Sequence, residues 1–249
     1  AYGRIGHWLT GYIAQQLLTP EAQLFVEELL PEQKGLLRDV ANWADDIKSN
    51  HSYDWAKPMH YVNPANECTP PVPSDCTGVC VLTGITNYTA SLSNPLADRP
   101  IALKFLIHLI GDLHNPLHVS GRARGGTQAP CMWRRRRVNL HQVWDHLMFE
   151  KRIADGFGGR RERYGDWVVE QLESKWAASV PGWIACPGGN GVASSCPLVW
   201  AAESSQANCD VVWPGYERRG DMSEAYYKKG IESAERLLVQ AALRTATVI

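Results

Sequence analysis

The stretch that decides the fold is PIALKFLIHLIGDLHNPLH, residues 100–118, which begins as an apolar helix and ends in titratable side chains. Its apolar residues recur at helical spacing, and a proline at the start is typical of a first helical turn. His108 and Asp112 are four residues apart, so they share one helix face. Buried polar groups need partners, so this pair is either a hydrogen-bonded pair of the core or a pair of metal ligands.

The rest of the chain continues the helical pattern. Helices are predicted over residues 5–18, 19–30, 36–48, 81–92, 100–114, 139–154, 164–180, 197–208 and 223–246. Residues 62–80 hold prolines, asparagines and cysteines and are predicted to form a loop. Runs of alternating β-branched residues are scarce, and there is neither a repeat nor a domain-sized linker. The sequence therefore predicts one all-α domain over residues 1–249.

The charge balance excludes one class of binding. The 25 Lys and Arg residues against 26 Asp and Glu residues leave a formal net charge of −1. The molecule as a whole therefore has no electric field that would hold nucleic acid or an anionic membrane nonspecifically, and anion binding must be local. No apolar run approaches the length of a membrane span and no intact signal peptide is present, so we expect no membrane span and a soluble or processed chain.

The cysteines indicate an oxidising compartment. They lie at residues 68, 76, 80, 131, 186, 196 and 209, mostly in loops rich in Pro, Gly, Ser and Asn. Zinc-finger spacing is absent, which favours disulfides over thiolate metal ligands and leaves Cys131 as the odd one out. Acceptor sequons at Asn50 and Asn87 fit a glycosylated chain. We therefore expect a secreted or vesicular protein.

More candidate ligands surround the first pair. His141 and Asp145 repeat the four-residue spacing, and the further candidates are His7, Asp45, His60 and His118. Imidazole and carboxylate without thiolate form the ligand set of catalytic zinc. Eight such residues are too many for one ion, but they fit two or three ions when one carboxylate bridges. Clustered divalent cations form a positive pocket, which suits a phosphate ester.

Several segments together resemble a known family. They are YGRIGH (2–7), NWADDIK (42–48), HYVNP (60–64), CVLTGITNYT (80–89), LKFLIHLIGDLHNPLHV (103–119) and NLHQVWD (139–145). They are similar, nearly end to end, to the zinc-dependent single-strand nuclease/3′-nucleotidase family, which is related to the zinc phospholipases C. The resemblance implies an all-α domain of that type with long disulfide-bridged loops and three zinc ions at the bottom of a cleft. It also implies cleavage of RNA, single-stranded DNA and 3′-nucleotides to 5′-phosphorylated products.

The resemblance assigns the ligands to three ions. The groups are Asp45, His60 and His108; Asp112 and His7; and His118, His141 and Asp145. Asp112 is expected to bridge the first two ions, with the attacking hydroxide between them and the third ion stabilising the leaving oxygen. In the family the N-terminal residue also binds metal through its amine and carbonyl. Tyr2 occupies that position, although Ala1 precedes it, and His114 is expected to orient ligands by hydrogen bonding.

Three more positions bear on the substrate. Tyr61 matches an aromatic residue on which a nucleobase stacks, the alternative being an ordinary buried tyrosine. Lys48 stands where many relatives carry arginine, and Asn63 stands where they commonly carry aspartate. Lysine still neutralises phosphate and an amide still hydrogen-bonds a base or water, but the bidentate geometry of arginine is lost.

The resemblance also implies a pairing of the cysteines, namely Cys76 with Cys80 and Cys68 with Cys209, which leaves Cys186 with Cys196. The run Arg134–Arg137 falls in a loop expected to overhang the cleft. It is either a solvated basic loop or a set of contacts to phosphates that flank the scissile bond.

The main hypothesis is therefore a monomeric zinc phosphodiesterase that acts on single-stranded nucleic acid and 3′-nucleotides. One alternative with the same fold is a phospholipase C. The other is a non-catalytic protein that binds zinc for stability, which the residues at Lys48 and Asn63 leave open.

Overall fold

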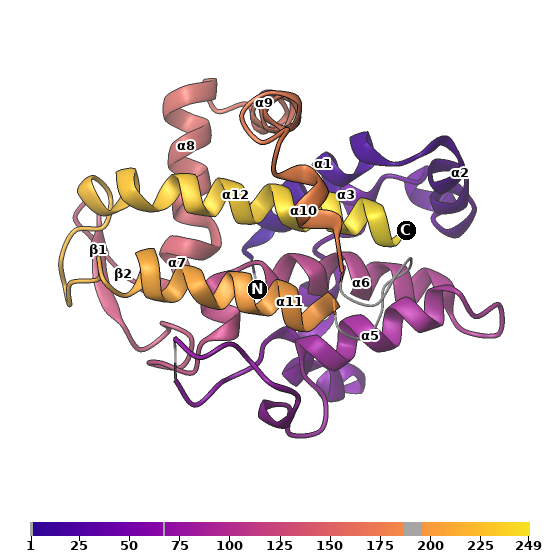
Figure 1. The fold of residues 1–249 in the computed structure, drawn as a ribbon, viewed down its shortest axis with the longest axis horizontal. Helices are drawn as coiled ribbons and strands as arrows, with labels where there is room; N and C mark the ends of the chain where they lie inside the picture. Colours follow the sequence, from indigo (N-terminus) through magenta and orange to yellow (C-terminus); the bar gives the residue numbers. More distant parts are fainter. Residues whose placement is uncertain (1, 67, 187–195) are drawn as a thin grey trace.

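The computed structural model describes residues 2–66, 68–186 and 196–249, and most of them are helical (Figure 1). The α-helices are α1 (Arg4–Leu17), α2 (Pro20–Leu29), α3 (Leu37–Val40), α4 (Trp43–Asp46), α5 (Val81–Leu92), α6 (Arg99–Leu113), α7 (Leu140–Gln142), α8 (Met148–Phe157), α9 (Arg161–Glu173), α10 (Val180–Ile184), α11 (Cys196–Ala207) and α12 (Ala225–Val248). The predicted all-α fold is confirmed.

Helix α6 forms the centre of the packing. The side chain of Asp98 caps its first turn by accepting a hydrogen bond of 3.1 Å from the Ile101 amide. Every residue from Phe105 to Leu113 is buried, because α5, α1, α4 and α12 all pack against this helix. A helix that is apolar all round gains stability only when it is covered on every side. The titratable side chains of α6 are therefore held inside the molecule.

The long helix α12 brings the C-terminal part of the chain against the N-terminal part. It runs across the molecule in Figure 1 and packs against α1. Arg244 on α12 donates to Glu203 on α11 over 2.6 Å, and Gln240 donates to the same carboxylate over 2.9 Å. These contacts fix α11 and α12 against each other beside α6.

Some local predictions were wrong. The helix expected over residues 36–48 is broken into α3 and α4, with Asn42 between them bonding its side chain to Asp46 over 2.9 Å. A π-helical segment, η6 (Val143–Leu147), interrupts the helix expected over residues 139–154.

The structure also contains elements that were not expected. A 3-10 helix, η3 (His51–His60), leads to the site, and strands β1 (Pro130–Trp133) and β2 (Arg136–Asn139) form a hairpin. The hairpin turn consists of Arg134 and Arg135, whose φ values of 46° and 66° are those of a tight two-residue turn.

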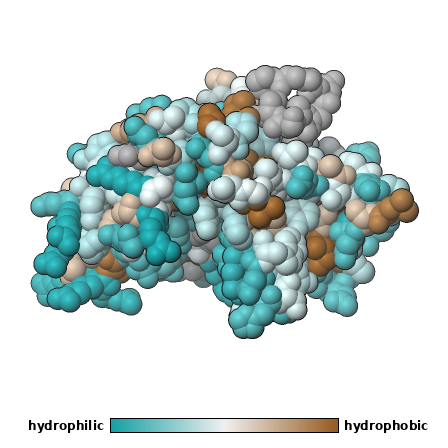
Figure 2. Space-filling model, turned by 90° about the horizontal axis from the view of Figure 1, so that it is seen from below, coloured by the Kyte–Doolittle hydropathy of each residue, from teal (hydrophilic) through white to brown (hydrophobic). Residues whose placement is uncertain are grey.

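The predicted disulfides are confirmed. They are Cys68–Cys209, Cys76–Cys80 and Cys186–Cys196, and Cys131 is free and buried. The face seen in Figure 2 is mainly hydrophilic, with hydrophobic residues in separate patches. Within the described ranges, no helix is long and apolar enough to cross a membrane.

Candidate metal centre

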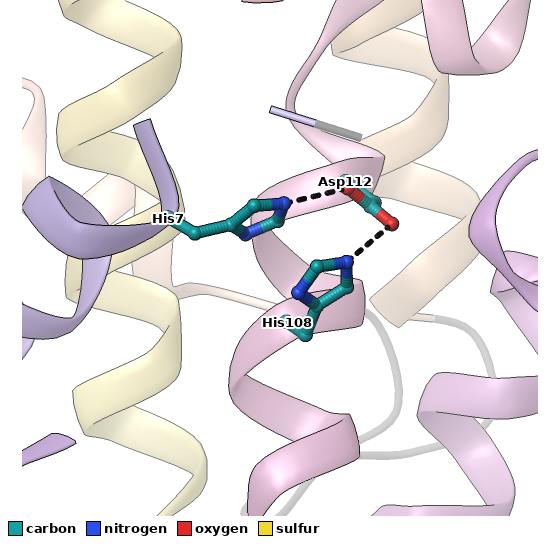
Figure 3. Close-up of side chains that lie close together, drawn as sticks. All are labelled: His7, His108 and Asp112. Carbon is teal, nitrogen blue, oxygen red and sulfur yellow. Dashed lines mark ion pairs between the residues drawn. The ribbon is translucent and has the colours of Figure 1, made fainter. Parts of the chain in front are cut away.

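The first group of metal-capable side chains joins α1 to α6. His7 on α1 and His108 on α6 both point at the carboxylate of Asp112 (Figure 3). Each Nε2 atom lies 3.2 Å from one of the two carboxylate oxygens, and all three side chains are fully buried. Gly111 permits this approach, because a Cβ atom there would lie only 3.0 Å from His7 Nδ1. The packing of α1 on α6 thus builds the group.

The second group shares His108 with the first and adds Asp45 from α4 and His60 from the end of η3. The Nε2 atom of His108 lies 3.4 Å from Asp45 Oδ1 and 3.1 Å from His60 Nδ1. His60 Nδ1 is also 2.7 Å from Asp112 Oδ2. Asp112 therefore contacts histidines of both groups, His7 through Oδ1 and His60 through Oδ2.

The third group consists of His118, His141 and Asp145. The Nε2 atom of His141 lies 3.1 Å from Asp145 Oδ2, and His118 Nε2 lies 4.0 Å from Asp145 Oδ1. Asn115 donates to Asp145 Oδ1 over 2.7 Å and so fixes the carboxylate. Asp145 belongs to the π-helical segment, a local form that is often found at functional sites.

Backbone carbonyls orient three of the histidines, His108, His118 and His141. The Nδ1 atom lies 2.8 Å from the Ala41 carbonyl in His108, 2.6 Å from the His60 carbonyl in His118 and 2.7 Å from the Gly125 carbonyl in His141. Donation from Nδ1 turns Nε2 of each ring toward the carboxylates of the cluster. Metal-binding histidines are held in this way.

The charges of the first two groups do not balance. Burial lowers the pKa of His7 and of His60 to about 4, so both rings are neutral at pH 7. Burial acts in the same direction on His108, but the carboxylates of Asp112 and Asp45 raise its pKa to about 9. Burial opposes ionisation of both carboxyl groups, yet His108 holds the pKa of each below its usual range. Two carboxylates thus face one imidazolium, an excess of negative charge that a divalent cation offsets.

The polar atoms of the groups fit a metal better than they fit one another. Within the described part of the chain, His7 Nδ1 and His60 Nε2 are buried without a hydrogen bond, and the 3.2 Å contact between His7 Nε2 and Asp112 Oδ1 lacks hydrogen-bond geometry. A buried polar atom without a partner costs about 1–3 kcal/mol. There are three groups of donor atoms, and within each group the atoms lie within 4.8 Å of one another. Each group is thus placed to hold a metal ion. Metal binding by these residues is supported by the structure.

His114 and Tyr2 lie outside the three groups. His114 Nδ1 bonds the Ile110 carbonyl over 2.7 Å, and its Nε2 accepts from Arg244 over 2.8 Å. Tyr2 is buried, donates its hydroxyl to the His114 carbonyl over 3.0 Å, and precedes Gly3, whose amide donates to the Asp145 carbonyl. Tyr2 is thus close to the cluster. Ala1 lies outside the described residues, so the structure does not test whether the backbone amine at Tyr2 can bind metal when Ala1 precedes it.

A cleft of about 410 Å³ opens beside the cluster. It is lined by Lys48, Lys57, His60, Tyr61, Asn63, Leu117, His118, Gly121, Arg124, Gly125, Thr127 and His141. The expected substrate residues Lys48, Tyr61 and Asn63 are all in this set. Tyr61 is 43% exposed, so it is not an ordinary core tyrosine. Lys48 Nζ lies 2.5 Å from Asp45 Oδ1, which ties the cleft wall to the second group.

Two features of the cleft differ from expectation. None of the arginines of the run Arg134–Arg137 lines it, and Arg134 pairs instead with Asp155 on α8 over 3.4 Å. Arg124 and Lys57, which were not singled out from the sequence, do line it. The sequence signal that could have pointed to Arg124 is the glycine pair that follows it, Gly125 and Gly126, which lies between the expected ligands His118 and His141.

Together, the fold and the site define a helical protein built around a cluster of side chains that could hold metal ions beside a cleft. The S1/P1 nuclease family profile matches residues 2–249, and the chain belongs to that family. It is 31% identical to Endonuclease 2 of Arabidopsis thaliana over 100% of this chain and 89% of the relative. It is 28% identical to Nuclease P1 of Penicillium citrinum, over 100% and 96%, and 29% identical to Nuclease S1 of Aspergillus oryzae, over 98% and 89%. The resemblance seen in the sequence is confirmed, and nucleases are hydrolases of ester bonds.

Proposed function

We propose that the chain is a zinc-dependent endonuclease and 3′-nucleotidase, with the whole chain, residues 1–249, as the catalytic unit. It hydrolyses phosphodiester bonds of RNA and single-stranded DNA and the 3′-phosphate of nucleotides, and it leaves 5′-phosphorylated products. The observation that supports this most is the location of three metal-capable groups beside one cleft, in a chain of the S1/P1 nuclease family.

Three zinc ions per chain are the proposed complement. The residues that would hold them are His7, Asp45, His60, His108, Asp112, His118, His141 and Asp145, with the backbone of Tyr2 as an additional ligand. Imidazole and carboxylate donors without thiolate suit zinc. When bound, the ions lower the pKa of a water molecule and offset charge on the phosphate. Asp112 contacts histidines of two groups, which supports the proposal that it would help to hold two of the ions.

The cleft residues then bind and orient the substrate. Lys48 neutralises charge on the phosphate from its place beside Asp45. The exposed ring of Tyr61 stacks on a nucleobase, a contact that is tolerant of sequence. The side-chain amide of Asn63 hydrogen-bonds the base or a water molecule. Lys48 and Asn63 thus act at the reacting phosphate, while Tyr61 selects nucleic acid.

The test combines elemental analysis with turnover. Purified protein is assayed on single-stranded DNA, RNA and adenosine 3′-phosphate before chelation, after chelation and after zinc is restored. We expect three zinc ions per chain and activity that chelation abolishes and zinc restores. His118→Ala should lose zinc and activity, because His118 belongs to the third group. His51→Ala is the matched control, since the His51 side chain is 94% exposed.

The same assay separates the alternatives when phosphatidylcholine is added as a fourth substrate. Hydrolysis of phosphatidylcholine without hydrolysis of nucleotides would identify a phospholipase C, an outcome that the exposed Tyr61 ring in the cleft argues against. Bound zinc without any turnover would identify a non-catalytic binding protein. The three disulfides support a secreted or vesicular location, because such bonds persist in oxidising compartments. We further propose a monomer, to be tested by light scattering.

A further inference from the structure

The loop that carries Arg124 has an unusual backbone. Ala123, Arg124, Gly125 and Gly126 are consecutive and have φ values of 49°, 53°, 61° and 76°. Residues other than glycine rarely adopt this left-handed region, since Cβ then crowds the following carbonyl. Such conformations persist where the surroundings hold them, and they cluster at functional sites. The side chain of Arg124 is therefore aimed by a constrained turn.

The metal centre holds this turn in place. The carbonyl of Gly125 accepts from His141 Nδ1 over 2.7 Å, so the residue next to Arg124 orients an expected ligand. A Cβ atom at Gly125 would lie 2.6 Å from the Leu117 carbonyl, so only glycine fits there. The amide of Gln128 closes the turn on the Ala123 carbonyl over 2.9 Å. Arg124 is thereby held at a fixed place relative to His141.

The guanidinium of Arg124 is available for an anion. Arg124 lines the cleft and makes no ion pair with any residue in the described ranges. It is exposed, whereas His108 and Asp112 of the metal centre are fully buried. The arginine therefore lies at the rim of the cleft and not at its base. An arginine fork matches two oxygens of a phosphate.

We propose that Arg124 binds the phosphate next to the scissile one. This rests on the proposed nuclease function, in which the scissile phosphate lies at the buried groups near Lys48, which is already paired with Asp45. A rim cation is placed for the next phosphate along the strand. Arg124 is then a specificity residue: it favours substrates with at least two phosphates over 3′-nucleotides and takes no part in the bond cleavage itself.

The experiment removes the charge from each side of this contact in turn. Zinc-loaded wild type, Arg124→Gln and Arg124→Lys are compared on adenosine 3′-phosphate and on end-labelled trinucleotides. In two further trinucleotides, one linkage or the other is a neutral methylphosphonate, and the labelled fragment shows which bond is cut. Arg163→Gln is the control, because Arg163 is an exposed arginine on α9 without an ion pair in the described ranges.

Arg124→Gln should lower kcat/KM on the natural trinucleotide about tenfold, the lower end for a charge-assisted hydrogen bond. On a methylphosphonate trinucleotide, in which the linkage next to the cleaved bond is neutral, the variant and wild type should have equal kcat/KM. Arg124→Lys should retain part of the effect, and adenosine 3′-phosphate should be turned over equally by all proteins. The proposal is overturned if Arg124→Gln loses as much kcat/KM on adenosine 3′-phosphate as on the natural trinucleotide. It is also overturned if the loss on both methylphosphonate trinucleotides is as large as on the natural one. If wild type cleaves no substrate, the proposed function itself fails.

Discussion

Replacing Asp112 by asparagine tests the centre of the site. The amide keeps the volume of the side chain but removes the charge that faces His60 Nδ1 at 2.7 Å and His7 and His108 Nε2 at 3.2 Å each. All these side chains are at most 2% exposed. The carboxylate accepts charge-assisted hydrogen bonds from His60 and His108, each worth about 1.5–3 kcal/mol, and their loss costs about 3–5 kcal/mol even though Asp45 still faces His108. For a chain of this size that lowers the melting temperature by about 6–20 °C.

The assay is thermal unfolding in the presence of chelator, followed by elemental analysis after dialysis against zinc. In chelator, Asp112→Asn should melt below wild type by that margin, since the imidazolium of His108 has lost a counter-charge. After dialysis it should hold fewer zinc ions per chain, because Asp112 contacts two of the groups. Asp210→Asn is the control, since Asp210 is exposed and an amide oxygen can still accept the 2.8 Å bond from Gln206.

Two results would count against this account. A melting temperature in chelator equal to that of wild type would show that the carboxylate of Asp112 is not held by the surrounding histidines. A zinc content equal to that of wild type would show that Asp112 is not a bridging ligand, whatever its effect on stability.

Three other expectations concern binding and stability. Tyr61→Leu should raise KM for single-stranded DNA by about 5- to 150-fold, the range of one lost base stack, and Tyr61→Phe should stay near wild type in the same kinetics. If the run Arg134–Arg137 contacts phosphates, changing all four to glutamine should flatten the salt dependence of polynucleotide binding by about 0.7 per lost contact, and an unchanged slope would reject that role. Burial and the nearby Glu235 raise the pKa of Tyr164, so its contribution to stability is complete below about pH 10 and is lost as pH rises further. Tyr164→Phe should therefore show a smaller fall in melting temperature between pH 8 and pH 11 than wild type.

Local sequence patterns determined much of this protein. Periodic apolar residues predicted α6, and spacing alone placed His108 and Asp112 on one face of it, where their side chains lie 3.2 Å apart. The same rule paired His141 with Asp145, although a π-helical segment intervenes. Residues within a turn or two of one helix have fixed relative positions, so these contacts follow from secondary structure. The family resemblance supplied the pairing of Cys68 with Cys209, which are 141 residues apart and beyond any spacing rule.

Only the tertiary structure decided how distant segments meet. His7, Asp45 and His60 reach the same carboxylate and imidazole of α6 because α1, α4 and η3 pack around that helix. The constrained turn that brings Arg124 to the cleft, and the hairpin that holds the arginine run away from it, also depend on such contacts. The physical reason is that residues far apart in the chain are brought together by side-chain packing and backbone bonds between elements. Those interactions have no fixed spacing in the sequence.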